Sequence, residues 1–228
     1  MAGAVDVAAL RESWLLRGLP EAEVGQLAGL MRRRSYRRGE VVMHQGDPGD
    51  SLHLIVQGHL KAVLFTESGE EVLLTILGRG ELFGELALLD GAPRSTTVVA
   101  LEPVETAVLT RAEFLGLLGR SPAAVEALLA SLARMIRRKD AAVADLFALD
   151  VHGRLAKKLL ELVEAHGRAE NGAIEIDLRL TQDDLAAMVG AARASVNKLL
   201  GFYEDRGVIA RRGRRIAVLK PELLHALA

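Results

Sequence analysis

Residues 83–100 bring together the kinds of group that hold a nucleotide. Their Phe-Gly-Glu-Leu-Ala start is typical of a short helix, whose first backbone N–H groups lack partners and whose positive dipole end attracts an anion. Gly84 has no Cβ, so a ligand can approach the backbone closely. Arg94 offers a planar fork of donors to phosphate oxygens, and an ionised Glu85 accepts hydroxyl hydrogens from a sugar. The stretch therefore predicts a nucleotide site, the alternative being a surface Arg–Glu pair beside an apolar strand.

A second group of residues, further along the chain, has the pattern of a DNA-binding surface. Thr181 is a good N-cap for a helix over residues 181–189, and the acids that follow it suit the positive end of the helix dipole. Gly190 supplies a tight turn before a second helix over residues 193–206. The outward-facing residues near the start of that helix are Arg193, Asn197 and Lys198. This pattern predicts a helix-turn-helix, whose second helix enters the major groove.

A basic hairpin follows the two helices. Apolar runs at 208–210 and 216–218 flank Arg-Arg-Gly-Arg-Arg, which predicts a wing whose turn carries cations for backbone phosphates. Between residues 193 and 220 there are eight Lys or Arg and two acids, although the whole chain has a net charge of −1. Upstream, we expect a helix over residues 151–166, a polar break over 167–172 and an edge strand over 174–178.

The elements that position the nucleotide site are predicted to be mostly strands. Between residues 39 and 109, short alternating or apolar runs are separated by Gly, Asp and Pro, which indicates a β-sandwich or jelly roll. We interpret the basic tract over residues 31–38 as an outward strand edge, where long cations discourage edge pairing, rather than as a nucleic-acid surface. His44, His53 and His59 are interpreted as strand and surface histidines, because they lack the His-x-His pair of a metal-binding cupin.

A long helix is predicted to begin at Ser121 and Pro122, which suit an N-cap and a first turn. Residues at alternating spacings of three and four follow, interrupted once by a lysine: Val125, Leu128, Leu132, Met135, Lys139, Ala142 and Leu146. This spacing is typical of a two-stranded coiled-coil seam, so we expect a homodimer, the alternative being a helix buried within a monomer.

Composition narrows the class of protein. The chain has 228 residues, enough for one large or two modest domains, and half of them are hydrophobic. It has no cysteine, which excludes disulfides, thiol catalysis and cysteine-held iron–sulfur clusters. No apolar run approaches the roughly 18 residues of a membrane span, and the start lacks a secretory signal, so we expect no membrane partner and a cytoplasmic location. No paired-carboxylate or Ser-His motif is recognisable, so we expect neither an enzyme nor a metal site.

The stretch over residues 83–100 resembles the phosphate-binding cassette of cyclic-nucleotide-binding domains, in particular that of the CRP/FNR family of bacterial transcription regulators. The resemblance implies that Glu85 holds the ribose 2′-hydroxyl and that Arg94 and Ser95 hold the cyclic phosphate. The resemblance to this family as a whole covers about residues 12–220. The residues it implies for the nucleotide are Gly84, Glu85, Leu86, Ala87, Arg94, Ser95, Thr96, Lys139 and Asp140.

Residues 181–218 resemble the winged helix-turn-helix of the same family. The resemblance implies that Arg193 reads a guanine edge, which suits a bidentate arginine, and that Lys198 contacts a base or a phosphate. Ala194 departs from the cAMP receptor branch, where many members have a cytosine-reading glutamate, so a different operator sequence is expected. The implied DNA-binding residues are Thr181, Gln182, Arg193, Ser195, Asn197, Lys198, Arg212 and Arg214.

Together these features predict an α+β protein: a jelly-roll sensor domain (1–119), a dimerisation helix (120–149) and a winged helix-turn-helix domain (150–228). The resemblance implies a homodimeric transcription activator that binds an operator duplex and RNA polymerase, gated by cAMP. Lys139 and Asp140 stand where cAMP-responsive relatives carry small hydroxyl or amide residues toward the adenine. The alternatives are therefore cyclic GMP, cyclic di-GMP, or a regulator of the same architecture that needs no small molecule.

Overall fold

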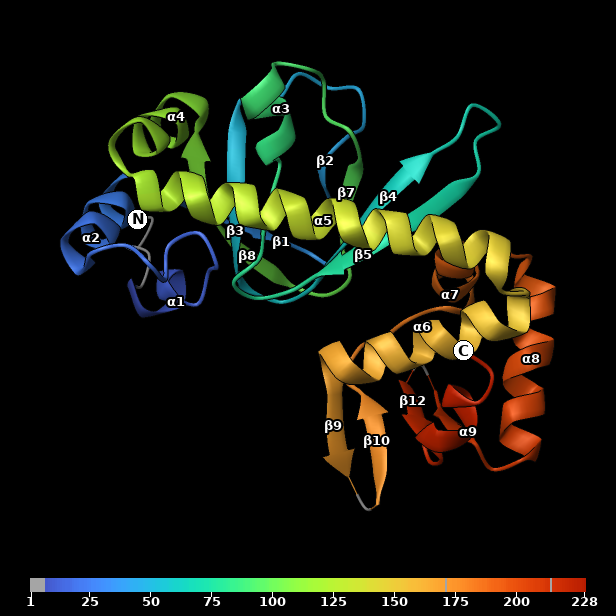
Figure 1. Cartoon of the computed structure of the whole chain (residues 1–228). Helices are drawn as coiled ribbons and strands as arrows, with labels where there is room; N and C mark the ends of the chain where they lie inside the picture. Colours follow the sequence, from blue (N-terminus) through green and yellow to red (C-terminus); the bar gives the residue numbers. More distant parts are fainter. Residues whose placement is uncertain (1–6, 171, 214) are drawn as a thin grey trace. The chain divides into compact units, whose positions relative to one another are not determined.

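The computed structural model describes residues 7–170, 172–213 and 215–228 (Figure 1). The sheets of the described residues are antiparallel, and strands and helices occur mostly in separate runs along the chain, so the predicted α+β class is confirmed. The described residues form two compact units, which divide after Arg137.

The first unit contains two four-stranded antiparallel sheets, as far as the chain is described. The first has the strand order β1 (Arg32–Tyr36), β8 (Val104–Thr110), β3 (Ser51–Gln57), β6 (Leu82–Phe83). The second has the order β2 (Val41–Met43), β7 (Thr97–Ala100), β4 (Leu60–Phe65), β5 (Glu71–Leu77). The exposed basic strand β1 lies at a sheet edge, so that prediction is confirmed.

Strand β3 is buried on both faces because it lies between two apolar clusters. Leu52 and Leu54 belong to one cluster, which is filled by residues of the helices α1 (Val7–Arg11), α2 (Glu21–Leu30) and α4 (Arg111–Arg120). Ile55 belongs to the other cluster, which joins the two sheets. Since successive side chains of a strand point to opposite faces, His53 faces the same side as Ile55.

The long helix α5 (Pro122–Ala148) begins where predicted, but its exposed apolar residues match the predicted seam only in part. Leu128 is only 5% exposed and packs in the core of its own unit, so the prediction that it faces a partner is wrong. The exposed stripe instead passes through Leu129, Ile136 and Val143, at heptad spacing and with exposed fractions of 60, 57 and 53%. Leu146, a predicted seam residue, is also exposed at 56%, so a seam for a second helix would use it together with these three residues, and not Leu128.

The second unit surrounds a four-stranded sheet with the order β11 (Ile209–Arg212), β12 (Arg215–Val218), β10 (Ala173–Ile176), β9 (Gly167–Glu170). Its helices are α6 (Val151–His166), α7 (Gln182–Val189), α8 (Arg193–Asp205) and α9 (Pro221–His225). The predicted edge strand is wrong, since β10 lies between β12 and β9. The predicted helix over residues 151–166 is confirmed and ends at the predicted polar segment, but Gly167–Glu170 of that segment form the strand β9, which was not predicted.

Candidate functional site

The cassette begins where β6 meets the short helix α3 (Glu85–Asp90). Its N-cap, Gly84, adopts a left-handed conformation with φ of 87° and has no side chain to satisfy the first N–H groups of α3. A Cβ there would lie 2.6 Å from Nη1 of Arg94 and 3.0 Å from the carbonyl oxygen of Ser51. Glycine is therefore required both for the turn and for the close approach of the arginine.

Arg94 is held in place by the protein itself. Its side chain is buried, with the residue 6% exposed. Nη1 donates to the carbonyl oxygen of Gly84 at 2.8 Å, and Nη2 donates to the carbonyl and Oγ of Ser51 at 2.8 and 3.1 Å. Its backbone N–H donates to the carbonyl of Asp47 at 2.8 Å. A guanidinium carries more donors than these bonds use, so some remain for a ligand.

The cassette contains one buried cation, Arg94, with three carboxylates near enough to affect its pKa. Burial lowers the pKa of Arg94, while the carboxylates of Asp50, Glu85 and Asp47 oppose that effect. An arginine keeps its charge even so, because its ordinary pKa lies far above neutrality. A buried cation whose hydrogen bonds run mainly to neutral oxygens gains from a ligand that brings negative charge.

The hydrogen bond from Arg94 to Gly84 brings the two parts of the predicted nucleotide-binding segment, residues 84–87 and 94–96, close together. Glu85 and Leu86 are half-buried in the first turn of α3, and Ala87 is buried. Ser95 is exposed directly after Arg94, and Thr96 leads into β7. Lys139 and Asp140 are exposed on α5, in the second unit, so their role toward a nucleotide stays a prediction.

Sequence reasoning missed the residues behind Arg94. His53 is 3% exposed and stacks on Phe83, with ring centroids 4.9 Å apart. Its Nδ1 lies 3.3 Å from Oγ1 of Thr106, and its Nε2 lies 3.5 Å from Oγ of Ser51. Burial above all, then the positive charges of Arg94 and Arg34, lower the pKa of His53 to about 4. The neutral His53 thus lies behind Ser51, the residue that holds Arg94. The only signal for it in the sequence is a polar histidine within an apolar strand.

The second candidate surface lies on α7 and α8. Thr181 caps α7 and forms a capping box with Asp184. Nη1 of Arg193 pairs with Oδ2 of Asp183 at 3.2 Å, and both side chains are mostly exposed. The other predicted residues of α8 are exposed as well: Ser195, Asn197 and Lys198. The predicted helix-turn-helix therefore presents these side chains on an accessible surface.

The wing is a two-stranded hairpin of β11 and β12, as predicted. Arg212 is exposed and lies 3.9 Å from Glu175, whereas Arg214 lies outside the described residues. Nη1 of Arg215 donates to Glu175 at 2.6 Å, and Arg211 pairs with Glu204. Sequence reasoning missed both acidic partners: Glu175 lies 40 residues before Arg215, whereas Glu204 lies seven residues before Arg211, at the end of α8.

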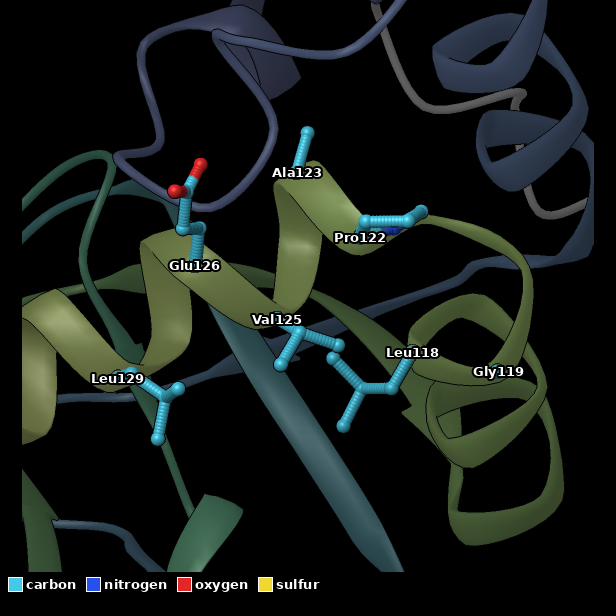
Figure 2. A pocket seen from close by; sticks show the side chains of 7 residues that line it. All are labelled: Leu118, Gly119, Pro122, Ala123, Val125, Glu126 and Leu129. Carbon is cyan, nitrogen blue, oxygen red and sulfur yellow. The ribbon is translucent and has the colours of Figure 1, made fainter.

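An apolar depression lies where α4 meets the start of α5 (Figure 2). The side chains of Leu118 and Val125 point toward one another, and Leu129 lies on the same side of α5 (Figure 2). Leu129 lines this depression and also belongs to the exposed stripe described above.

Two further features concern membranes and metals. In the described ranges no single helix is long and apolar enough to cross a membrane; α4 and α5 pass that test only as a pair, bent by 111°. Among the same residues, no group of three or more His, Asp or Glu could hold a metal ion. His59 pairs with Glu102 at 2.6 Å, and His44 is exposed.

Comparison with known proteins assigns a family to each part of the chain. Residues 33–121 match the cyclic nucleotide-binding domain and residues 153–227 match the Crp-like helix-turn-helix domain. The CRP-like cAMP-activated global transcriptional regulator of Mycobacterium tuberculosis H37Rv is 34% identical over 94% of this chain and 96% of its own length. Among solved structures, a CRP/FNR-family regulator of Thermus thermophilus is 27% identical with a TM-score of 0.72, covering 86% of this chain and 97% of that one. The c-di-GMP responsive regulator CLP of Xanthomonas campestris shares the fold at 20% identity, with a TM-score of 0.75 over 93% and 99% of the two chains.

Proposed function

The chain belongs to the CRP/FNR family of transcription regulators, and from this premise we propose that it is a homodimeric DNA-binding activator gated by a cyclic nucleotide, with cAMP as the first ligand to test. The observation that carries the proposal is the buried guanidinium of Arg94, held between Gly84 and Ser51. In this assignment residues 1–119 sense the ligand, 120–149 pair the subunits and 150–228 bind DNA.

The cyclic phosphate would lie against Arg94, Ser95 and the first N–H groups of α3, because these groups offer only donors or a donor-capable hydroxyl. Glu85, an acceptor in the first turn of α3, would take the ribose hydroxyl. Similarity to the cAMP-activated regulator of Mycobacterium tuberculosis supports cAMP as the ligand of this chain. The c-di-GMP responsive structural neighbour supports cyclic di-GMP as the alternative. Effector-free activity is the second candidate, since Arg94 keeps its position through protein hydrogen bonds alone.

Pairing through α5 would bury the stripe of Leu129, Ile136 and Val143, which a lone subunit leaves in water. A dimer also presents two recognition helices, and dimers of helix-turn-helix proteins read two DNA half-sites about 34 Å apart. A nucleotide can favour DNA binding only if it binds the DNA-competent arrangement more tightly than the other. RNA polymerase is proposed as the partner of the DNA-bound dimer, and the cytoplasm as its location.

Titration calorimetry with cAMP, cGMP and cyclic di-GMP tests the sensor half. We expect saturable cAMP binding that Arg94→Lys weakens strongly, because lysine keeps the charge but cannot bridge Gly84 and Ser51 while facing a phosphate. Arg79→Lys is the matched control, since Arg79 is exposed and pairs with Glu12 in the same unit. Fluorescence anisotropy with operator DNA then tests gating. Equal DNA affinity with and without every nucleotide refutes gating and supports the effector-free alternative.

A further inference from the structure

Asn197 occupies an unusual position on the recognition helix. It is exposed and lies four residues after Arg193, so both side chains share one face of α8. Its side-chain oxygen, Oδ1, accepts from Nε2 of Gln182 at 3.0 Å and from Nη1 of Arg211 at 3.0 Å. The amide is therefore held from α7 on one side and from the wing strand β11 on the other.

Arg211 is itself anchored. Its Nε donates to Oε2 of Glu204 at 2.7 Å, its Nη2 pairs with the same carboxylate, and its backbone N–H donates to Oε1 at 2.9 Å. Hydrogen bonds from Arg211 are also the largest cause of the lowered pKa of Glu204. With the side chains of Arg211 and Glu204 only 29 and 30% exposed, this arginine braces the wing against α8 rather than reaching outward.

The anchored arginine fixes which way round the Asn197 amide lies. A guanidinium has donors and no acceptor, so only the amide oxygen can face it. Gln182 also approaches Oδ1, and the two donors occupy the oxygen. The group that Asn197 has left for other partners is its NH2, which only donates.

We propose that Asn197 is a specificity-determining residue that reads a base edge through N–H donors alone. An unrestrained asparagine pairs with adenine by donating to N7 and accepting from N6. The braced amide cannot accept, so it favours the keto bases, guanine and thymine, whose O6 and O4 accept in the major groove. Cytosine presents only an amino group there, and adenine presents an amino group beside its N7 acceptor, so both are disfavoured relative to guanine, whose O6 and N7 both accept. This inference rests on the proposed DNA-binding function.

The test is a selection of bound duplexes from a random library, followed by affinities for single-base variants of the winning site. The wild-type protein, with and without saturating cAMP, is expected to select a keto base at one position of each half-site. Asn197→Ala is expected to reduce that preference about tenfold and leave the other positions unchanged, in the range of one base contact. Arg211→Met frees the amide to turn, so adenine should become acceptable at the same position.

Arg212→Met is the matched control, because it removes an equal charge from the same strand and Arg212 does not contact Asn197. It is expected to weaken binding to every sequence alike and to keep the keto preference. Arg211→Lys, which retains a cationic donor, guards against loss of folding and is expected to keep the preference too. Thermal denaturation checks that each variant is folded.

Three results overturn the inference: adenine or cytosine selected at the position that Asn197→Ala affects, a uniform loss of affinity in Asn197→Ala, or the same base preference in Arg211→Met and Arg212→Met. A uniform loss would mean a phosphate contact instead of a base contact. Failure of the proposed function looks different, because the wild-type protein would then select no sequence at all.

Discussion

The buried histidine behind the cassette makes stability depend on pH in a defined window. His53 lies 3% exposed on the inner face of β3, between Phe83 and Thr106. Burial and the nearby charges of Arg94 and Arg34 lower its pKa from 6.5 to about 4. The folded protein therefore keeps this ring neutral at pH values where the unfolded chain protonates it.

The size and sign of the effect follow from that difference. Between about pH 6.5 and pH 4 the unfolded chain binds more protons at this residue, so the free energy of unfolding falls as the pH falls. Each pH unit of difference in pKa corresponds to about 1.4 kcal/mol, so the complete loss is about 3 kcal/mol. Below about pH 4 both states are protonated and no further loss occurs; above about pH 6.5 both are neutral.

Urea denaturation between pH 4 and pH 8 measures the effect as the difference between wild type and His53→Phe. Phenylalanine keeps the stacking on Phe83 and does not titrate, so the wild type should lose about 3 kcal/mol relative to the variant across the window. Other titrating groups cancel in this difference. His44→Gln, which removes an exposed histidine, is the control and should follow the wild type. Parallel curves for wild type and His53→Phe would refute the argument.

Three other substitutions test the remaining elements. Gly84→Ala should cost about 1–2 kcal/mol of stability, because φ is 87° there and the new Cβ meets Arg94, and should weaken nucleotide binding; unchanged calorimetry would contradict this. Thr181→Ala removes the cap of α7 and should cost about 1 kcal/mol in urea denaturation, an expectation that fails if the midpoint does not move. Ile136→Lys places a charge in the exposed stripe and should yield monomers in sedimentation at micromolar concentration, whereas a persistent dimer would show that pairing lies elsewhere.

The parts of the site that sequence predicted are those whose chemistry is local. Gly84, Glu85 and Arg94 lie within eleven residues, and the helix-turn-helix has its cap and turn in one short segment. Thr106 was missed because it meets His53 only after β3 and β8 pair, and Ser51 because it meets Arg94 only after the loop before β7 packs against β3. A hydrogen bond between residues 43 apart leaves no periodic trace in the chain.

The errors have equally specific causes. Residues 128 and 129 are both leucine, so spacing alone could not say which one enters the core of its own unit and which one stays outside. Strand β9 was missed because Gly167–Glu170 is exposed throughout and lacks any alternation. Its backbone still pairs with β10, which turns an expected edge strand into an inner one. Tertiary contacts, rather than the local sequence pattern, decide which of the two leucines is buried and which strand lies inside the sheet.

Acids pair with several of the arginines from residue 193 onward, in a chain whose net charge is −1. Glu204 and the 7% exposed Glu175 hold Arg211 and Arg215, so these arginines brace the wing. Arg193 pairs with Asp183 between exposed side chains, a contact worth at most about 1 kcal/mol. A competing phosphate displaces such an exposed pair easily. Removing an arginine from the buried Glu175 is costly, because the carboxylate is then left without a partner for its charge. Burial of the acid thus separates Arg211 and Arg215, which hold the wing in place, from Arg193, whose pair with Asp183 is exposed and easily exchanged.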